Sequence, residues 1–112
     1  SDVDKRSYVR GKLPDFISQA GNKAELLKRI VRVIGAGPAS ESLQTMSTVQ
    51  GMSDFWNDNP KLKNSFAEDL KKVSKDLKDK EVKDLMIKSS NEMVPPPEPK
   101  KSSSSSFFNS KK

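Results

Sequence analysis

The sequence contains no histidine and no cysteine. Their absence removes the ordinary protein ligands for zinc, copper, haem and iron–sulfur clusters, together with the commonest general base. It also excludes disulfide bonds. Most catalytic and redox sites are therefore excluded, and we expect neither an enzyme nor a protein that carries a cofactor.

Apolar residues are also scarce: they make up 32% of the 112 residues, and aromatic residues only 6%. Globular proteins average roughly 45–50% on a slightly wider count, and a chain of this length forms one domain at most. No apolar run approaches the roughly 20 residues that span a bilayer. We therefore expect a thin core without a large enclosed substrate pocket and without a transmembrane segment.

Charge, in contrast, is abundant. The 21 lysines and arginines outnumber the 15 acidic residues, which gives a formal net charge of +6 and a pI near 9.6. Such a balance favours acidic partners, either protein surfaces or nucleic acids.

Apolar residues recur at helical spacing, and glycine or proline interrupts them where helices would end. The pattern predicts an all-α fold, a small bundle of about four helices over residues 14–93. Gly11 and Pro14 indicate a loose N-terminal arm over residues 1–13, with a short helix starting at Pro14. Residues 94–112 predict an extended tail rich in proline and serine.

Four longer helices are expected within the bundle. The first follows Asn22, which can cap it while Glu25 completes a capping box. The others cover residues 39–57, with a possible bend at Gly51, then 60–77 with Asn59 as its cap, and 80–93 capped by Asp79.

The helix over residues 60–77 has a lysine-rich face that could contact phosphates or an acidic protein. The alternative is a solvated face with internal ion pairs such as Glu68–Lys72 and Asp76–Lys80. Nucleic-acid binding also calls for arginines or aromatic rings among the cations, whereas Phe55 and Trp56 lie in an acidic segment. Nucleic acid is therefore the less favoured partner.

The tail carries an adjacent aromatic pair, Phe107 and Phe108, flanked by lysines. The pair could fill a hydrophobic groove on a partner while the lysines attract an acidic rim; the alternative is an idle solvated end. The residues that we predict to dock a partner are Arg29, Arg32, Lys71, Lys72, Lys75, Lys78, Phe107 and Phe108.

For catalysis, the remaining candidates are Asp54 and Asp58, which lie four residues apart on one helix face and could share a proton or hold a hard cation. No other candidate group converges on them in the sequence. We therefore predict no catalytic residue and no metal site.

A basic helical bundle over residues 12–93 without cysteine or histidine, followed by a proline-rich extension, resembles the small helical extrinsic proteins of the photosystem II oxygen-evolving side, in particular an algal type. The resemblance implies a non-catalytic protein, peripheral in the thylakoid lumen of the chloroplast. It also implies docking on an intrinsic membrane complex and help in retaining the ions that water oxidation needs.

The sequence thus predicts an accessory subunit that docks on and stabilises a large assembly, possibly photosystem II. Its partners would be protein subunits with acidic surfaces. A small basic protein that binds nucleic acid or a ribonucleoprotein is the alternative.

Overall fold

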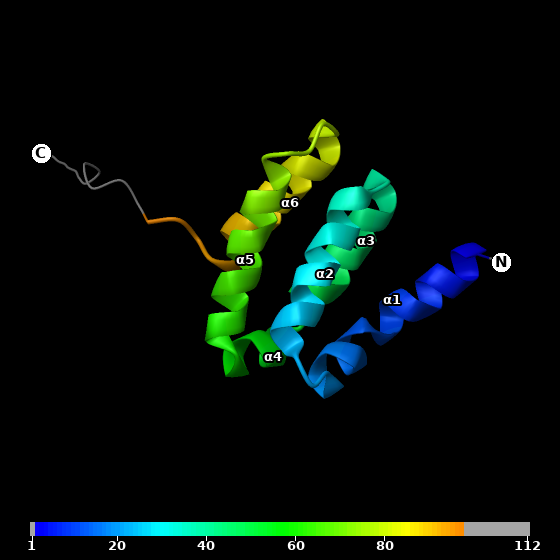
Figure 1. Ribbon diagram of the computed structural model, residues 1–112, viewed down its shortest axis with the longest axis vertical. Coiled ribbons are helices and arrows are strands. Elements are labelled where there is room, and N and C mark those ends of the chain that lie inside the picture. The colour runs from blue at the N-terminus through cyan, green and yellow to red at the C-terminus, as the bar shows by residue number, and fades with distance from the viewer. Residues whose placement is uncertain (1, 98–112) are drawn as a thin grey trace, which may run out of the picture.

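The computed structural model describes residues 2–97, apart from the side chain of Val3. Within that range every regular element is an α-helix, so the all-α prediction is confirmed, but six helices replace the predicted four or so (Figure 1). They are α1 (Asp2–Gln19), α2 (Lys23–Ala36), α3 (Ala39–Gln50), α4 (Ser53–Asp58), α5 (Pro60–Ser74) and α6 (Lys80–Met93). None of the described helices is long and apolar enough to cross a membrane.

Helices α2, α3, α5 and α6 form the bundle, α1 packs on α2 and α3, and the short α4 packs against α5. Two contacts show that α2 and α5 run in the same direction. Lys28 Nζ of α2 lies 3.2 Å from Asp69 Oδ2 of α5, and further along both helices Gly35 of α2 lies beside Val73 of α5. The two helices are close there: a β-carbon on Gly35 would lie 3.2 Å from Cγ1 of Val73.

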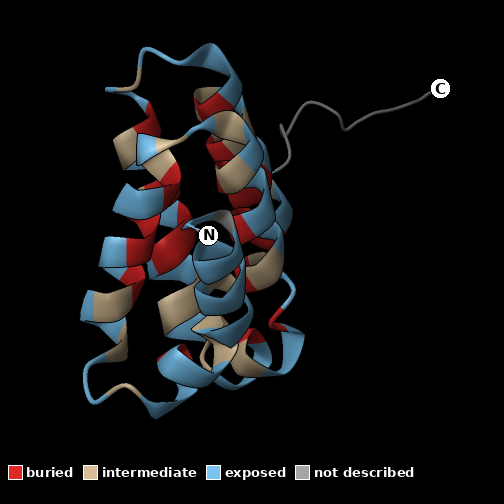
Figure 2. Ribbon diagram, turned by 90° about the vertical axis from the view of Figure 1, so that its right-hand side faces the viewer, coloured by how far each residue is buried: buried red, intermediate tan, exposed pale blue. Residues whose placement is uncertain are grey.

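Buried residues line the inward sides of the bundle helices, whereas most of α1 is exposed (Figure 2). Trp56 anchors one end of the core. Its indole Nε1 donates a hydrogen bond to the carbonyl of Val49 at 2.9 Å, and its ring stacks on Phe66 with centroids 5.3 Å apart. The buried apolar residues are Ile17, Leu27, Ile30, Val31, Ile34, Met46, Val49, Met52, Trp56, Phe66, Ala67, Leu70, Val82, Met86 and Met93.

The predicted loose arm over residues 1–13 is wrong in its secondary structure, since α1 is helical from Asp2 and continues through Pro14. Contacts beyond the helix explain the difference. Ile17 is fully buried, and the exposed half of α1 is tied to α3 by Arg6–Glu41 at 3.1 Å and Arg10–Gln44 at 2.7 Å. Tertiary contacts thus outweigh the local cost of an interior proline.

The predicted helix over residues 39–57 is divided into α3 and α4. The break falls at Gly51 and Met52, and the N–H of Gly51 donates to the carbonyl of Ser47 at 3.0 Å. Gly51 therefore ends a helix where we expected a bend. The change of direction lets Trp56 reach back to the carbonyl of Val49.

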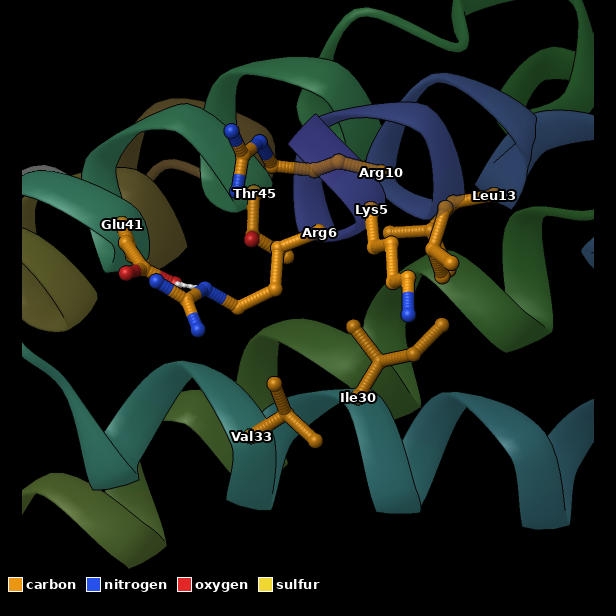
Figure 3. Close-up of a pocket in the computed structure, with 9 residues that line it drawn as sticks. Lys5, Arg6, Arg10, Leu13, Ile30, Val33, Glu41 and Thr45 are labelled. Atoms are coloured by element: carbon orange, nitrogen blue, oxygen red, sulfur yellow. Dashed lines mark ion pairs between the residues drawn. The ribbon is translucent and has the colours of Figure 1, made fainter. Parts of the chain in front are cut away.

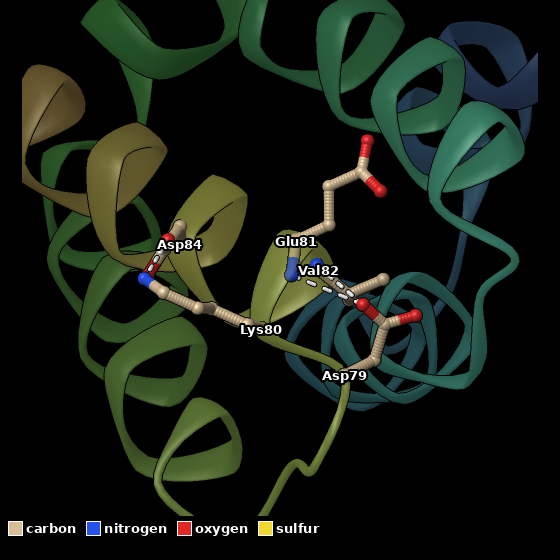
Figure 4. Close-up of polar contacts among 5 residues, drawn as sticks. All are labelled: Asp79, Lys80, Glu81, Val82 and Asp84. Carbon is tan, nitrogen blue, oxygen red and sulfur yellow. Dashed lines mark hydrogen bonds and ion pairs between the residues drawn. The ribbon is translucent and has the colours of Figure 1, made fainter.

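Capping was predicted correctly at two of three positions. The Asn22 side chain accepts from the N–H of Glu25 at 3.0 Å, and Asp79 accepts from the N–H groups of Glu81 and Val82 at 3.0 and 3.3 Å (Figure 4). Asn59, in contrast, does not cap α5; its Nδ2 donates to the carbonyl of Phe55 at 2.9 Å.

The helix predicted over residues 60–77 ends three residues early, at Ser74, while α6 has its predicted bounds. The early end changes the expected ion pairing. Lys80 pairs with Asp84 at 2.8 Å rather than with Asp76, and this hydrogen bond and charge raise the pKa of Lys80 above its ordinary value (Figure 4). The expected Glu68–Lys72 pair is also not formed. Of the predicted tail, residues 94–97 are described and contain no helix.

Candidate docking surfaces

Four of the predicted docking lysines gather at one end of the bundle. Lys71 and Lys72 lie in the last turn of α5, and Lys75 and Lys78 lie in the connection to α6 (Figure 1). We call this group the lysine end. Lys72, Lys75 and Lys78 are exposed and Lys71 is half-buried. Among the described residues, none of the four forms an ion pair.

The lysine end also has a local structural role. The last carbonyls of a helix carry partial negative charge, which nearby lysines stabilise. Two acids, Asp76 and Asp79, lie in the same stretch, and Asp79 is engaged in capping α6. The surface therefore carries free cations among a few acids rather than an uninterrupted positive stripe.

The two predicted arginines of α2 are three residues apart and lie side by side on the helix surface, but they differ in pairing. Arg29 is paired with Glu25 at 3.4 Å on the outer side of the helix. Lys28 faces α5, where it pairs with Asp69. Arg32 lies four residues after Lys28 and so also lies toward α5, because residues four apart share a helix face. Arg32 is exposed and forms no ion pair among the described residues. Of the two, Arg29 is engaged within α2, whereas Arg32 has no such ion pair in the described part of the chain.

Phe107 and Phe108 lie outside the described residues. The chain leaves the bundle after Met93, at the opposite end of α6 from the lysine end (Figure 1). The 14 residues of α6 separate the two by about 21 Å along the helix axis. Any docking through both the lysine end and the tail would thus use two separate points.

A hollow of about 340 Å³, which was not predicted, lies between α1, α2 and α3 (Figure 3). We call it the α1 groove. Its apolar walls are Val9 and Leu13 of α1 and Ile30 and Val33 of α2. Lys5, Arg6 and Arg10 of α1, with Glu41 and Thr45 of α3, form its polar rim.

The rim cations differ in what they already bind. Arg6 is paired with Glu41 at 3.1 Å, and Arg10 donates to Gln44 Oε1 at 2.7 Å. Lys5 forms no ion pair among the described residues, and its ammonium points into the space between α1 and α2 (Figure 3). The groove thus combines an apolar slot with one uncommitted cation.

The sequence held a signal for this groove. Val9 and Leu13 are four residues apart, as are Arg6 and Arg10, so a helical α1 presents an apolar row beside a basic one. Gly11 and Pro14 led us to discount that helix. Its packing against α2 and α3 could not be read from local pattern.

If the protein were an enzyme, we would expect a buried carboxylate cluster around Asp54 and Asp58. Both residues are exposed on α4. In the part of the chain that the structure describes, no group of three or more acidic residues is placed to hold a metal ion. These two acids are therefore placed as solvated surface groups.

No protein-family model, curated protein or solved structure matches the chain. The functional argument therefore depends on the chemistry of the surfaces described above.

Proposed function

We propose that the protein is a non-catalytic accessory subunit that docks on an acidic surface of a larger protein assembly. The observation that carries the proposal is the lysine end, where four lysines that form no ion pair with any described residue gather at one end of a small bundle. Cations of this kind steer association with an acidic partner and add contacts once it is bound.

Several features favour a protein partner over nucleic acid. Trp56 and Phe66 are buried against each other and offer no ring to stack on a base. The exposed rings of Tyr8 and Phe16 lie on α1 rather than at the lysine end. The cations near the lysine end alternate with Asp76, Asp79 and Glu81, which would repel phosphates. Interspersed charge of both signs suits a protein surface that carries a matching pattern.

The resemblance to extrinsic photosystem II proteins supplies a specific candidate for the assembly. We propose docking on the lumenal side of photosystem II as the first case to test. The net charge of +6 favours docking on an acidic lumenal surface.

The proposal can be tested by cosedimentation of the full chain with thylakoid membranes stripped of peripheral proteins. We expect saturable binding that weakens as salt rises, because exposed charge pairs are screened over about 8–10 Å at physiological ionic strength. Fluorescence anisotropy with generic duplex and single-stranded oligonucleotides forms the second arm. Micromolar binding to the oligonucleotides at physiological salt, without membrane binding, would instead identify a nucleic-acid-binding protein.

A further inference from the structure

We propose that the α1 groove binds a single-chain amphipathic anion, specifically a fatty acid with its carboxylate on Lys5 and its alkyl chain between α1 and α2. The groove lies apart from the lysine end, so this inference does not depend on the proposed docking function.

The size of the groove favours a small molecule. A hollow of about 340 Å³ lies at the lower end of the roughly 300–1,000 Å³ that small-molecule sites occupy. Its α1 wall consists of Val9 and Leu13, one helical turn apart. Such a short wall contacts one extended chain but offers little surface to a second helix.

The walls are apolar and partly exposed without a ligand. Val33 has 61% of its surface exposed and Val9 has 49%, while Ile30 at the base is buried. An alkyl chain that covers these side chains removes apolar surface from water, which is the main source of binding free energy for such ligands.

Charge selects the head group. Glu41 is neutralised by Arg6 at 3.1 Å, and Arg10 is held by Gln44. Lys5 remains as the cation without an ion pair among the groove residues, and its ammonium points toward the slot (Figure 3). A carboxylate is therefore favoured over a neutral or cationic head group.

Charge also disfavours a second copy of the chain in the groove. Each copy carries a net charge of +6, and the groove rim is itself basic. Two copies brought together at this face would place like charges side by side.

The test uses isothermal titration calorimetry of the full chain with laurate below its micelle-forming concentration. Octanoate and decanoate are the shorter probes, and dodecanol is the uncharged match. We expect one laurate per chain, and about fourfold tighter binding for each added methylene that enters the slot. Dodecanol should bind more weakly by up to about fivefold, the range of an exposed ion pair.

Two matched pairs of variants locate the site. Val33→Glu places a carboxylate in the slot, and Leu43→Glu places one at a similarly exposed position outside it, 54% against 61% exposed. We expect Val33→Glu to weaken laurate binding at least about tenfold and Leu43→Glu to leave it nearly unchanged. Lys5→Gln should remove the preference for laurate over dodecanol, whereas Lys12→Gln, on the same helix but outside the groove, should keep it.

Circular dichroism of each variant confirms folding, so a loss of binding can be assigned to the site. Absence of saturable laurate binding would overturn the inference, as would equal loss in Val33→Glu and Leu43→Glu. A stable dimer in sedimentation, lost only in Val33→Glu, would assign the groove to a second copy and also overturn it.

Discussion

At the scale of single residues, Gly37 holds the turn between α2 and α3 in a conformation that suits glycine alone. Its φ of 70° and ψ of −166° lie in a region that is costly for any residue with a β-carbon. From there its N–H donates to the carbonyl of Ile34 at 3.2 Å, and the Ser42 hydroxyl donates to the same carbonyl at 2.5 Å. The turn thus completes the C-terminus of α2 and sets the direction of α3.

We expect Gly37→Ala to lower the free energy of unfolding by about 1–3 kcal/mol. Space is not the cause, since a β-carbon would meet Val82 Cγ2 at an ordinary 3.7 Å. The measurement is urea unfolding followed by circular dichroism. Gly21→Ala is the control, because a β-carbon there meets no atom within 4 Å and the backbone is not left-handed; it should be neutral or slightly stabilising. Equal stability of the two variants would refute the role of the Gly37 backbone.

At the scale of elements, the connection between α5 and α6 depends on one cap. Asp79 accepts from the N–H groups of Glu81 and Val82 (Figure 4). Asp76, three residues earlier, makes no such contact with α6. Both aspartates are exposed and lie near the same lysines. They therefore differ in capping while sharing a similar charge environment.

We expect Asp79→Ala to destabilise the protein by about 1 kcal/mol, the usual cost of losing such a cap. Asp76→Ala removes the same charge and should change stability by no more than about 0.5 kcal/mol. Urea unfolding of both variants gives the comparison. A matching loss in Asp76→Ala would mean that charge at this end, rather than the cap, sustains the start of α6.

Local signals account for how well each element could be predicted. α6 has its expected bounds because Asp79 fixes its start, and α2 begins where Asn22 caps it. The helix from Pro14 onward was predicted, but the first part of α1 was missed because Gly11 and Pro14 are local signals against a helix. The contacts that hold this first part reach across to α3. The division of α3 from α4 likewise depends on Trp56 reaching the Val49 carbonyl, seven residues away.

The candidate sites likewise differ in whether their residues are close together in the sequence. The lysine end lies within one stretch of sequence, so its clustering could be predicted from helical spacing. Arg29, which we predicted as a docking residue of α2, pairs with Glu25 four residues earlier and is not part of this cluster. The α1 groove could not be predicted, because its walls and rim come from three helices whose packing no local pattern specifies.

At the scale of the whole molecule, the protein offers separate surfaces rather than one. The lysine end and the exit of the tail lie at opposite ends of α6, and the α1 groove lies on the side of the bundle that α1 covers (Figures 1 and 3). A net charge of +6 guides the chain toward acidic surfaces, while the placement of individual cations decides where it docks. Total charge and charge position are therefore the two quantities to separate by experiment.

The most direct measurement compares two charge-matched triple variants of the full chain for binding to stripped thylakoid membranes. One carries Lys72→Gln, Lys75→Gln and Lys78→Gln at the lysine end; the other carries Lys12→Gln, Lys61→Gln and Lys88→Gln at exposed positions elsewhere. Both triple variants remove three positive charges, and glutamine is nearly as good a helix former as lysine. We predict that the first variant binds about tenfold more weakly than the native chain, at about 0.5 kcal/mol per lost contact, and that the second stays within about twofold. Equal weakening of both would show that only total charge matters and would contradict docking through the lysine end.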